Sequence, residues 1–129
     1  MKNPAPGRKR RLLIAEDDPD ILWILVDYFG SLGYEAHGAE TGGAALALAL
    51  EIKPELIITD LVMPGLSGFE LLKKIAAVSG KASPPVIVLS ARVEPEAREQ
   101  AAALGAVKYL TKPFRLAELT ESVAAVLPA

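Results

Sequence analysis

The chain has 129 residues, of which 51% are hydrophobic and 23% charged, a composition typical of one soluble globular domain. No apolar run approaches the roughly 20 residues of a membrane span, and the basic start leads into an apolar run too short for a signal peptide. The absence of cysteine excludes disulfides and cysteine-based zinc sites. We therefore expect a cytoplasmic protein with no membrane partner.

The basic residues are concentrated at the N-terminus. Residues 1–11 carry five Lys or Arg and no acid. The rest of the chain contains the other nine Lys or Arg and all 16 Asp or Glu, so its net charge is near −7. A folded part this acidic is a poor candidate for binding nucleic acid directly. We expect residues 1–10 to form a disordered basic tail and residues 11–129 to form the domain. Contact of the tail with an anionic partner is the alternative.

Strand-like and helix-like segments alternate five times along the rest of the chain. The predicted strands span residues 12–15, 34–39, 56–60, 86–89 and 107–110. The predicted helices begin at Pro19, after the capping residues Thr41 and Ser67, at Pro95 and near Leu116. Continuous apolar strands between amphipathic helices indicate a parallel sheet covered on both faces. The fold class that we predict is therefore α/β, with a single doubly wound domain.

Polar side chains follow four of the five predicted strands. They are Glu16 and Asp17 after the first strand, Asp60 after the third, Ser90 after the fourth and Lys112 after the fifth. Because parallel strands end at the same edge of a sheet, all five side chains can share one pocket. Each by itself is also explained as a helix cap, a turn former or a solvated side chain. Their coincidence at one edge favours a functional site.

These residue types suit the transfer of a phosphoryl group to Asp60. Three neighbouring carboxylates raise one another's pKa unless a cation is present, and a ligand set made only of oxygen suits Mg²⁺, with Mn²⁺ as the alternative ion. A hydroxyl and an ammonium group can stabilise the charge of a phosphoryl group. An aspartate can itself be the nucleophile and form an acyl phosphate. The sequence thus predicts Mg²⁺-dependent phosphoryl transfer.

The chain resembles the receiver domain of bacterial two-component response regulators from about Arg11 to Leu127. The matching segments are residues 13–19, 58–68, 86–91 and 108–114. Each segment is a weak signal, but all four in this order and at these spacings are highly specific. The resemblance implies a flavodoxin-like (βα)5 fold with a five-stranded parallel sheet in the order 2-1-3-4-5.

The resemblance also implies a donor and a metal site. Asp60 is expected to accept the phosphoryl group from a sensor histidine kinase or a histidine phosphotransfer protein. Glu16, Asp17, Asp60 and the backbone carbonyl of Val62 are expected to hold Mg²⁺. Such a protein is a signalling switch and not a turnover enzyme, although it catalyses its own phosphorylation and slow dephosphorylation.

Further roles follow from the same resemblance. Ser90 is expected to bond a phosphoryl oxygen, Lys112 to pair with the acyl phosphate, and Tyr109 to be an aromatic switch that moves together with Ser90. The Lys112–Pro113 peptide bond is expected to be cis, and Gly68 to adopt a positive φ. The fourth helix, fifth strand and fifth helix would then present a changed face to a downstream partner or to a second copy.

The phosphoryl group is expected to be long-lived. Val62 and Arg92, two residues beyond Asp60 and Ser90, occupy positions that in the family flank the path of the attacking water. Apolar Val62 is unable to orient that water, so hydrolysis should be slow.

Other functions stay open at this point. The chain can be a phosphorelay or scaffold module without output, or a fragment of a longer response regulator or hybrid kinase. A phosphatase with an aspartyl nucleophile would use similar chemistry, but the Asp-x-Asp arrangement is missing after Asp60. A flavin mononucleotide binder shares the fold, but Glu16, Asp17 and Asp18 would repel the phosphate of the flavin.

Overall fold

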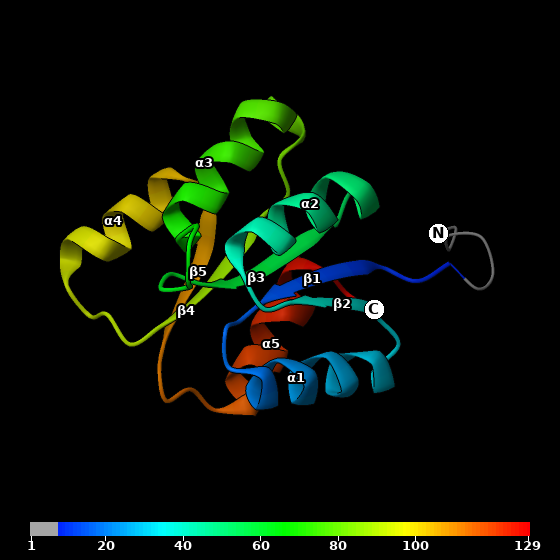
Figure 1. Cartoon of the computed structure of the whole chain (residues 1–129). Coiled ribbons are helices and arrows are strands. Elements are labelled where there is room, and N and C mark those ends of the chain that lie inside the picture. Colours follow the sequence, from blue (N-terminus) through cyan, green and yellow to red (C-terminus); the bar gives the residue numbers. More distant parts are fainter. Residues whose placement is uncertain (1–7) are drawn as a thin grey trace.

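Strands and helices alternate along the chain in the computed structural model, which describes residues 8–129 (Figure 1). The strands are β1 (Arg11–Ala15), β2 (Glu35–Ala39), β3 (Leu56–Asp60), β4 (Val86–Ser90) and β5 (Ala106–Thr111). The α-helices are α1 (Pro19–Ser31), α2 (Gly42–Ile52), α3 (Gly68–Ser79), α4 (Pro95–Ala103) and α5 (Leu116–Val126). A short 3-10 helix, η1 (Gly80–Ala82), lies between α3 and β4. The five predicted strands and five predicted helices are confirmed.

The five strands form one parallel sheet in the order β2-β1-β3-β4-β5, as predicted. The central strands β3 and β4 are buried along their whole length, whereas β2 and β5 lie at the two edges and are partly exposed. This difference explains why the segment Glu35–Ala39 is the least apolar strand in the sequence: an edge strand has fewer neighbours to pack against.

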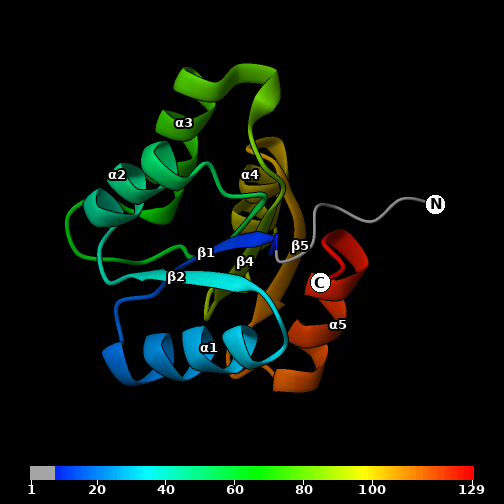
Figure 2. The same ribbon diagram turned by 90° about the vertical axis from the view of Figure 1, so that its right-hand side faces the viewer.

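Side chains of successive strand residues point to opposite faces of the sheet, so each strand supplies two cores. Leu12 and Ile14 of β1 pack with α1 and α5, and Leu13 and Ala15 pack with α2, α3 and α4. Figures 1 and 2 show these two helical layers on either side of the sheet. No helix within residues 8–129 is both long and apolar enough to cross a membrane.

Local capping fixes where the helices begin, and the helices begin next to the carboxyl ends of the strands. The Asp18 carboxylate accepts hydrogen bonds from the backbone N–H groups of the first turn of α1, and Thr41 Oγ1 accepts one from Ala44 in α2. Ser67, the predicted cap of α3, forms a capping box with Glu70. These caps hold the loops that leave the strands at the edge where the predicted site lies.

At the opposite edge of the sheet, Glu55 links the start of β3 to the start of β1 and the residues before it. Its carboxylate accepts hydrogen bonds from the backbone N–H of Arg11 at 3.0 Å and from the Arg10 guanidinium at 3.0 Å, and Arg8 lies 3.7 Å away. Residues 1–7 of the predicted disordered tail lie outside the described residues, and the domain boundary at residue 11 stays a prediction. The contacts of Arg8 and Arg10 nevertheless join the end of that segment to the start of β3.

We expect Glu55→Gln to destabilise the protein by about 1 kcal/mol at pH 7, the net worth of one hydrogen bond. Burial raises the pKa of Glu55, but the hydrogen bonds from Arg11 and Arg10 and the charges of Arg8 and Arg10 lower it, with a net decrease from 4.5. A depressed pKa contributes stability above the unfolded value, and this stability is lost as the pH falls through the folded value. Urea unfolding should therefore show a difference between the two proteins at pH 7 that shrinks below about pH 4.

The exposed Glu51 of α2 provides the control, since Glu51→Gln should change little at either pH. A difference for Glu55→Gln that is equally large at pH 7 and pH 3 would show that the charge of Glu55 is not the cause.

Candidate functional site

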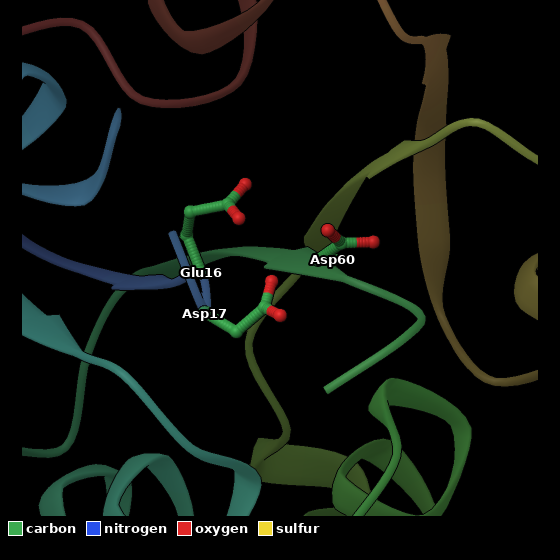
Figure 3. Close-up of side chains that lie close together, drawn as sticks. All are labelled: Glu16, Asp17 and Asp60. Atoms are coloured by element: carbon green, nitrogen blue, oxygen red, sulfur yellow. The ribbon is translucent and has the colours of Figure 1, made fainter. Parts of the chain in front are cut away.

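Three carboxylates converge at the carboxyl edge of the sheet (Figure 3). Glu16 and Asp17 directly follow β1, and Asp60 is the last residue of the neighbouring strand β3. One carboxylate oxygen from each of the three lies within 4.8 Å of the other two. Glu16 and Asp60 are buried and Asp17 is exposed, so the cluster opens to solvent on the Asp17 side. The structure thus brings together the three acidic residues that the sequence singled out.

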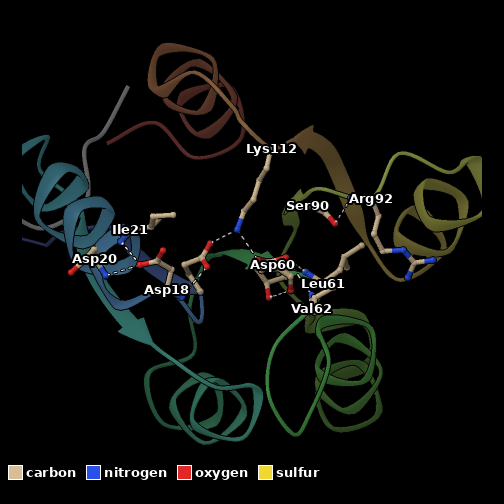
Figure 4. Close-up of polar contacts among 11 residues, drawn as sticks. Asp18, Asp20, Ile21, Asp60, Leu61, Val62, Ser90, Arg92 and Lys112 are labelled. Atoms are coloured by element: carbon tan, nitrogen blue, oxygen red, sulfur yellow. Dashed lines mark hydrogen bonds and ion pairs between the residues drawn. The ribbon is translucent and has the colours of Figure 1, made fainter.

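The two oxygens of the Asp60 carboxylate have different partners. Oδ1 accepts hydrogen bonds from the backbone N–H groups of Leu61 at 2.7 Å and Val62 at 3.2 Å. Oδ2 accepts one from the Lys112 ammonium at 2.7 Å, and Figure 4 shows Lys112 extending towards Asp60. The backbone and the ammonium group therefore hold the carboxylate in one orientation.

Lys112 follows β5 and joins the carboxylates of two other strands. Its Nζ lies 2.7 Å from Glu16 Oε1 and 2.7 Å from Asp60 Oδ2. Its backbone N–H donates to the Ser90 carbonyl at 2.8 Å, and the Lys112–Pro113 peptide bond is cis, as predicted. These contacts place the start of the β5–α5 loop beside the ends of β1, β3 and β4.

The charges in this cluster affect one another. Burial lowers the pKa of Lys112, but the hydrogen bonds and charges of Asp60 and Glu16 outweigh it, so the pKa of Lys112 is raised and the ammonium stays protonated. Burial raises the pKa of Glu16, and the hydrogen bond from Lys112 offsets only part of that increase. One ammonium balances one of three carboxylates, which leaves a net charge that a divalent cation would neutralise. The oxygen-only donor set fits Mg²⁺.

Val62 takes part through its backbone. Its N–H donates to Asp60 Oδ1, and its side chain is 62% exposed. The residue is thus directly beside the carboxylate, while its predicted use of the carbonyl oxygen as a metal ligand stays a prediction.

Ser90 lies fully buried at the end of β4, next to β3. Its Oγ accepts a hydrogen bond from the backbone N–H of Arg92 at 3.1 Å. The Arg92 side chain turns away from Asp60 in Figure 4. It pairs with Glu94 at 3.0 Å, and its guanidinium carbon lies 5.9 Å from the centre of the Phe69 ring. Ser90 is therefore engaged with the loop before α4 in this structure.

Tyr109 contacts the same loop from β5. Its hydroxyl donates to the Arg92 carbonyl at 2.8 Å, and the Arg98 guanidinium carbon of α4 lies 4.5 Å from the centre of its ring. The peptide groups on either side of Arg92 thus connect the predicted switch residues Ser90 and Tyr109. The sequence did not reveal Arg98, because α4 has a weak apolar stripe and no spacing indicates which of its residues faces β5.

The prediction that Gly68 adopts a positive φ is wrong. Among the described glycines, positive φ values occur at Gly33, Gly65, Gly80 and Gly105, and Gly65 is the one in the loop after Asp60. Gly68 is required for a different reason. A Cβ at Gly68 would overlap the Asp60 carbonyl oxygen and lie 2.8 Å from Leu61 Cα. Close packing, and not backbone dihedral, excludes a side chain there.

Comparison with known proteins agrees with this geometry. The family model described as the response regulator receiver domain matches residues 12–124. Protein PilH of Pseudomonas aeruginosa is 32% identical over 117 residues, which are 91% of this chain and 97% of PilH. The transcriptional regulatory protein KdpE of Mycobacterium tuberculosis is 39% identical over 83% of this chain, but the match spans only 46% of KdpE.

Solved structures give the same result. The chemotaxis protein CheY4 of Vibrio cholerae superposes with a TM-score of 0.85 at 30% identity, over 93% of this chain and all of CheY4. The receiver domain of a Francisella response regulator superposes with a TM-score of 0.83 at 32% identity, over 92% of this chain and 96% of that domain. The chain therefore belongs to the response regulator receiver domain family of two-component signalling, whose members act as signalling switches.

Proposed function

We propose that the protein is a phosphoacceptor switch that takes a phosphoryl group from the phosphohistidine of a sensor histidine kinase or histidine phosphotransfer protein onto Asp60. The observation that carries this proposal is the geometry of Asp60. Its carboxylate ends a central strand, contacts the Lys112 ammonium at 2.7 Å and lies within 4.8 Å of oxygens of Glu16 and Asp17. These encounters would take place in the cytoplasm.

In the proposed reaction, an Asp60 oxygen attacks phosphorus while the P–N bond of the phosphohistidine breaks. The electron pair of that bond stays on the imidazole nitrogen, which takes up a proton. Mg²⁺, held by Glu16, Asp17, Asp60 and the Val62 carbonyl, would supply neutralisation of charge on the phosphoryl oxygens. Lys112 would stabilise the same charge, because its raised pKa keeps it protonated.

A surface next to Lys112 suits the approach of the donor. Ile21, Pro113 and Phe114 line a hollow together with Lys112. An apolar hollow of this kind can accommodate an uncharged imidazole ring and the side chains around it.

Incubation with acetyl phosphate and Mg²⁺ should give a single phosphoryl adduct by intact mass. The adduct should be absent in Asp60→Asn, which keeps the shape of the side chain but removes the nucleophilic carboxylate. Chelation of Mg²⁺ should also abolish it, because the charges of the phosphoryl oxygens are then unbalanced.

Failure to form an adduct with a folded protein, from either acetyl phosphate or a phosphorylated histidine donor, would contradict the proposal. Repeated turnover of p-nitrophenyl phosphate would instead indicate the phosphatase alternative.

We further propose that phosphorylation changes the α4-β5-α5 face, which a downstream partner or a second copy would recognise. The added charge would draw Ser90 towards the phosphoryl oxygens and away from the Arg92 N–H. The Arg92 peptide would then move, and its carbonyl would no longer accept the hydrogen bond from the Tyr109 hydroxyl. In this structure two contacts, with the Arg92 carbonyl and the Arg98 guanidinium, hold the half-buried Tyr109 ring beside α4, and we refer to this as its outward position.

Replacing Arg98 should shift this equilibrium. An exposed cation–π contact contributes about 0.5–1 kcal/mol, so Arg98→Gln should raise the ratio of inward to outward Tyr109 roughly two- to fivefold. Fluorotyrosine NMR of the unphosphorylated protein would measure the ratio, with the Tyr109 signal assigned from Tyr109→Phe.

Lys81→Gln, which removes a positive charge from η1, is the control and should leave the signal where it is. If the Tyr109 signal of Arg98→Gln coincides with that of wild type, the proposed role of Arg98 in the switch is contradicted.

We also propose that the phosphoryl group is long-lived. The Val62 side chain is apolar, and the Arg92 side chain pairs with Glu94, so neither is arranged to orient a water molecule over Asp60. Slow hydrolysis would let a signal persist after the donor is gone.

Val62→Asn should speed the loss of the phosphoryl group roughly fivefold, because one new hydrogen bond of about 1 kcal/mol would orient the attacking water. Decay of the adduct after removal of the donor, followed by intact mass, measures the rate. Val62→Leu should decay like wild type, and equal rates in Val62→Asn and wild type would contradict the explanation.

A further inference from the structure

The loop of residues 61–67 connects Asp60 to α3 and carries part of the site. At its start, the N–H groups of Leu61 and Val62 bond the Asp60 carboxylate. At its end, the Gly68 N–H donates to the Leu61 carbonyl at 2.9 Å. The position of this loop therefore decides where the carboxylate and the Val62 backbone lie.

A third contact of the loop comes from a helix that carries none of the site residues. Gly42 is the first residue of α2 and is buried. A Cβ at Gly42 would overlap the carbonyl oxygen of Leu66 and lie 2.7 Å from Leu66 Cβ and 2.8 Å from its carbonyl carbon. These atoms belong to or adjoin the backbone, so rotation of a flexible side chain would not relieve the overlap.

The adjacent glycine is in a different situation. A Cβ at Gly43 would meet no atom within 4 Å. The two glycines thus share a helix and a sequence context, but only Gly42 touches the loop after Asp60.

The start of α2 is held in place by a helix cap and by packing in the core. Thr41 caps the helix, and Ala45 and Ala49 are buried against the sheet. Ala39, just before this helix, accepts a hydrogen bond from the Glu16 N–H at 3.0 Å. The chain before α2 is therefore bonded to the backbone of Glu16 on one side of the site. On the other side, Gly42 lies against the loop that follows Asp60.

We propose that Gly42 is a positioning residue of the phosphoacceptor site: it lets the Leu66 backbone lie directly against α2, which sets the position of the loop that holds Asp60 and Val62. This inference rests on the proposed function for its consequence, since the loop is expected to contribute to Mg²⁺ binding and phosphoryl transfer. A side chain at position 42 pushes the loop away from α2, and displacements below 1 Å are enough to impair a site of this kind.

Gly42→Ala and Gly43→Ala form the matched pair for the test. In Gly42→Ala, we expect Mg²⁺ affinity by calorimetric titration and the initial rate of adduct formation from acetyl phosphate each to fall at least fivefold. In Gly43→Ala, both should stay within twofold of wild type, and the midpoint of thermal unfolding should rise because alanine is the better helix former. In the metal-free protein, backbone amide NMR signals of residues 61–63 and 65–67 should move in Gly42→Ala and not in Gly43→Ala.

A second pair covers the case in which Gly42→Ala does not fold. Leu66→Ala removes a partly buried side chain of the loop that packs against the core, and Leu50→Ala removes an exposed leucine from α2. Leu66→Ala should lower Mg²⁺ affinity at least twofold and shift the loop amide signals, and Leu50→Ala should do neither.

Equal Mg²⁺ affinity and equal loop signals in Gly42→Ala and Gly43→Ala would overturn the inference, as would equal results in the leucine pair. Failure of the proposed function looks different. In that case wild type itself forms no adduct, while the amide signals of the metal-free proteins still show whether Gly42 positions the loop.

Discussion

The double ion pair of Lys112 with Glu16 and Asp60 is the interaction on which the arrangement of the site depends. Its Nζ lies 2.7 Å from an oxygen of each carboxylate and joins residues separated by 96 and 52 positions in the chain. Without it, two buried carboxylates would face each other uncompensated, which is strongly unfavourable. The ammonium thus makes it possible for β1 and β3 to end in acids side by side, in a cluster that still carries an excess of negative charge for a cation.

Backbone groups do much of the remaining positioning. The N–H groups of Leu61 and Val62 bond one Asp60 oxygen, and Gly68 lies so close to the Asp60 carbonyl that a side chain has no room. Such contacts restrict the Asp60 carboxylate more tightly than side chains on a free loop would, because the backbone around them is anchored in the sheet and in a capped helix. The contact of Gly42 with Leu66 extends this support to α2.

The link between the site and the surface is short. Arg92 donates its N–H to Ser90 and accepts the Tyr109 hydroxyl at its carbonyl, so a single residue lies between the end of β4 and the face formed with α4 and β5. In the switch that we propose, a small displacement of Ser90 would therefore reach Tyr109. Because the Tyr109 ring also contacts Arg98, the resting position of this proposed switch would depend on contacts outside the site.

The sequence by itself determined the order and type of the elements, the capping residues and the five polar side chains that meet at one edge of the sheet. These follow from local signals: apolar strands of the right length, caps one residue before a helix, and acids directly after strands. Only the tertiary structure decided which atoms touch. It placed Lys112 between Glu16 and Asp60, turned Arg92 away from Asp60, set Arg98 over Tyr109, and showed that Gly68 is needed for close packing and not for its φ angle. Contacts of this kind depend on how the strands, helices and loops pack against one another, and no spacing within a single sequence encodes them.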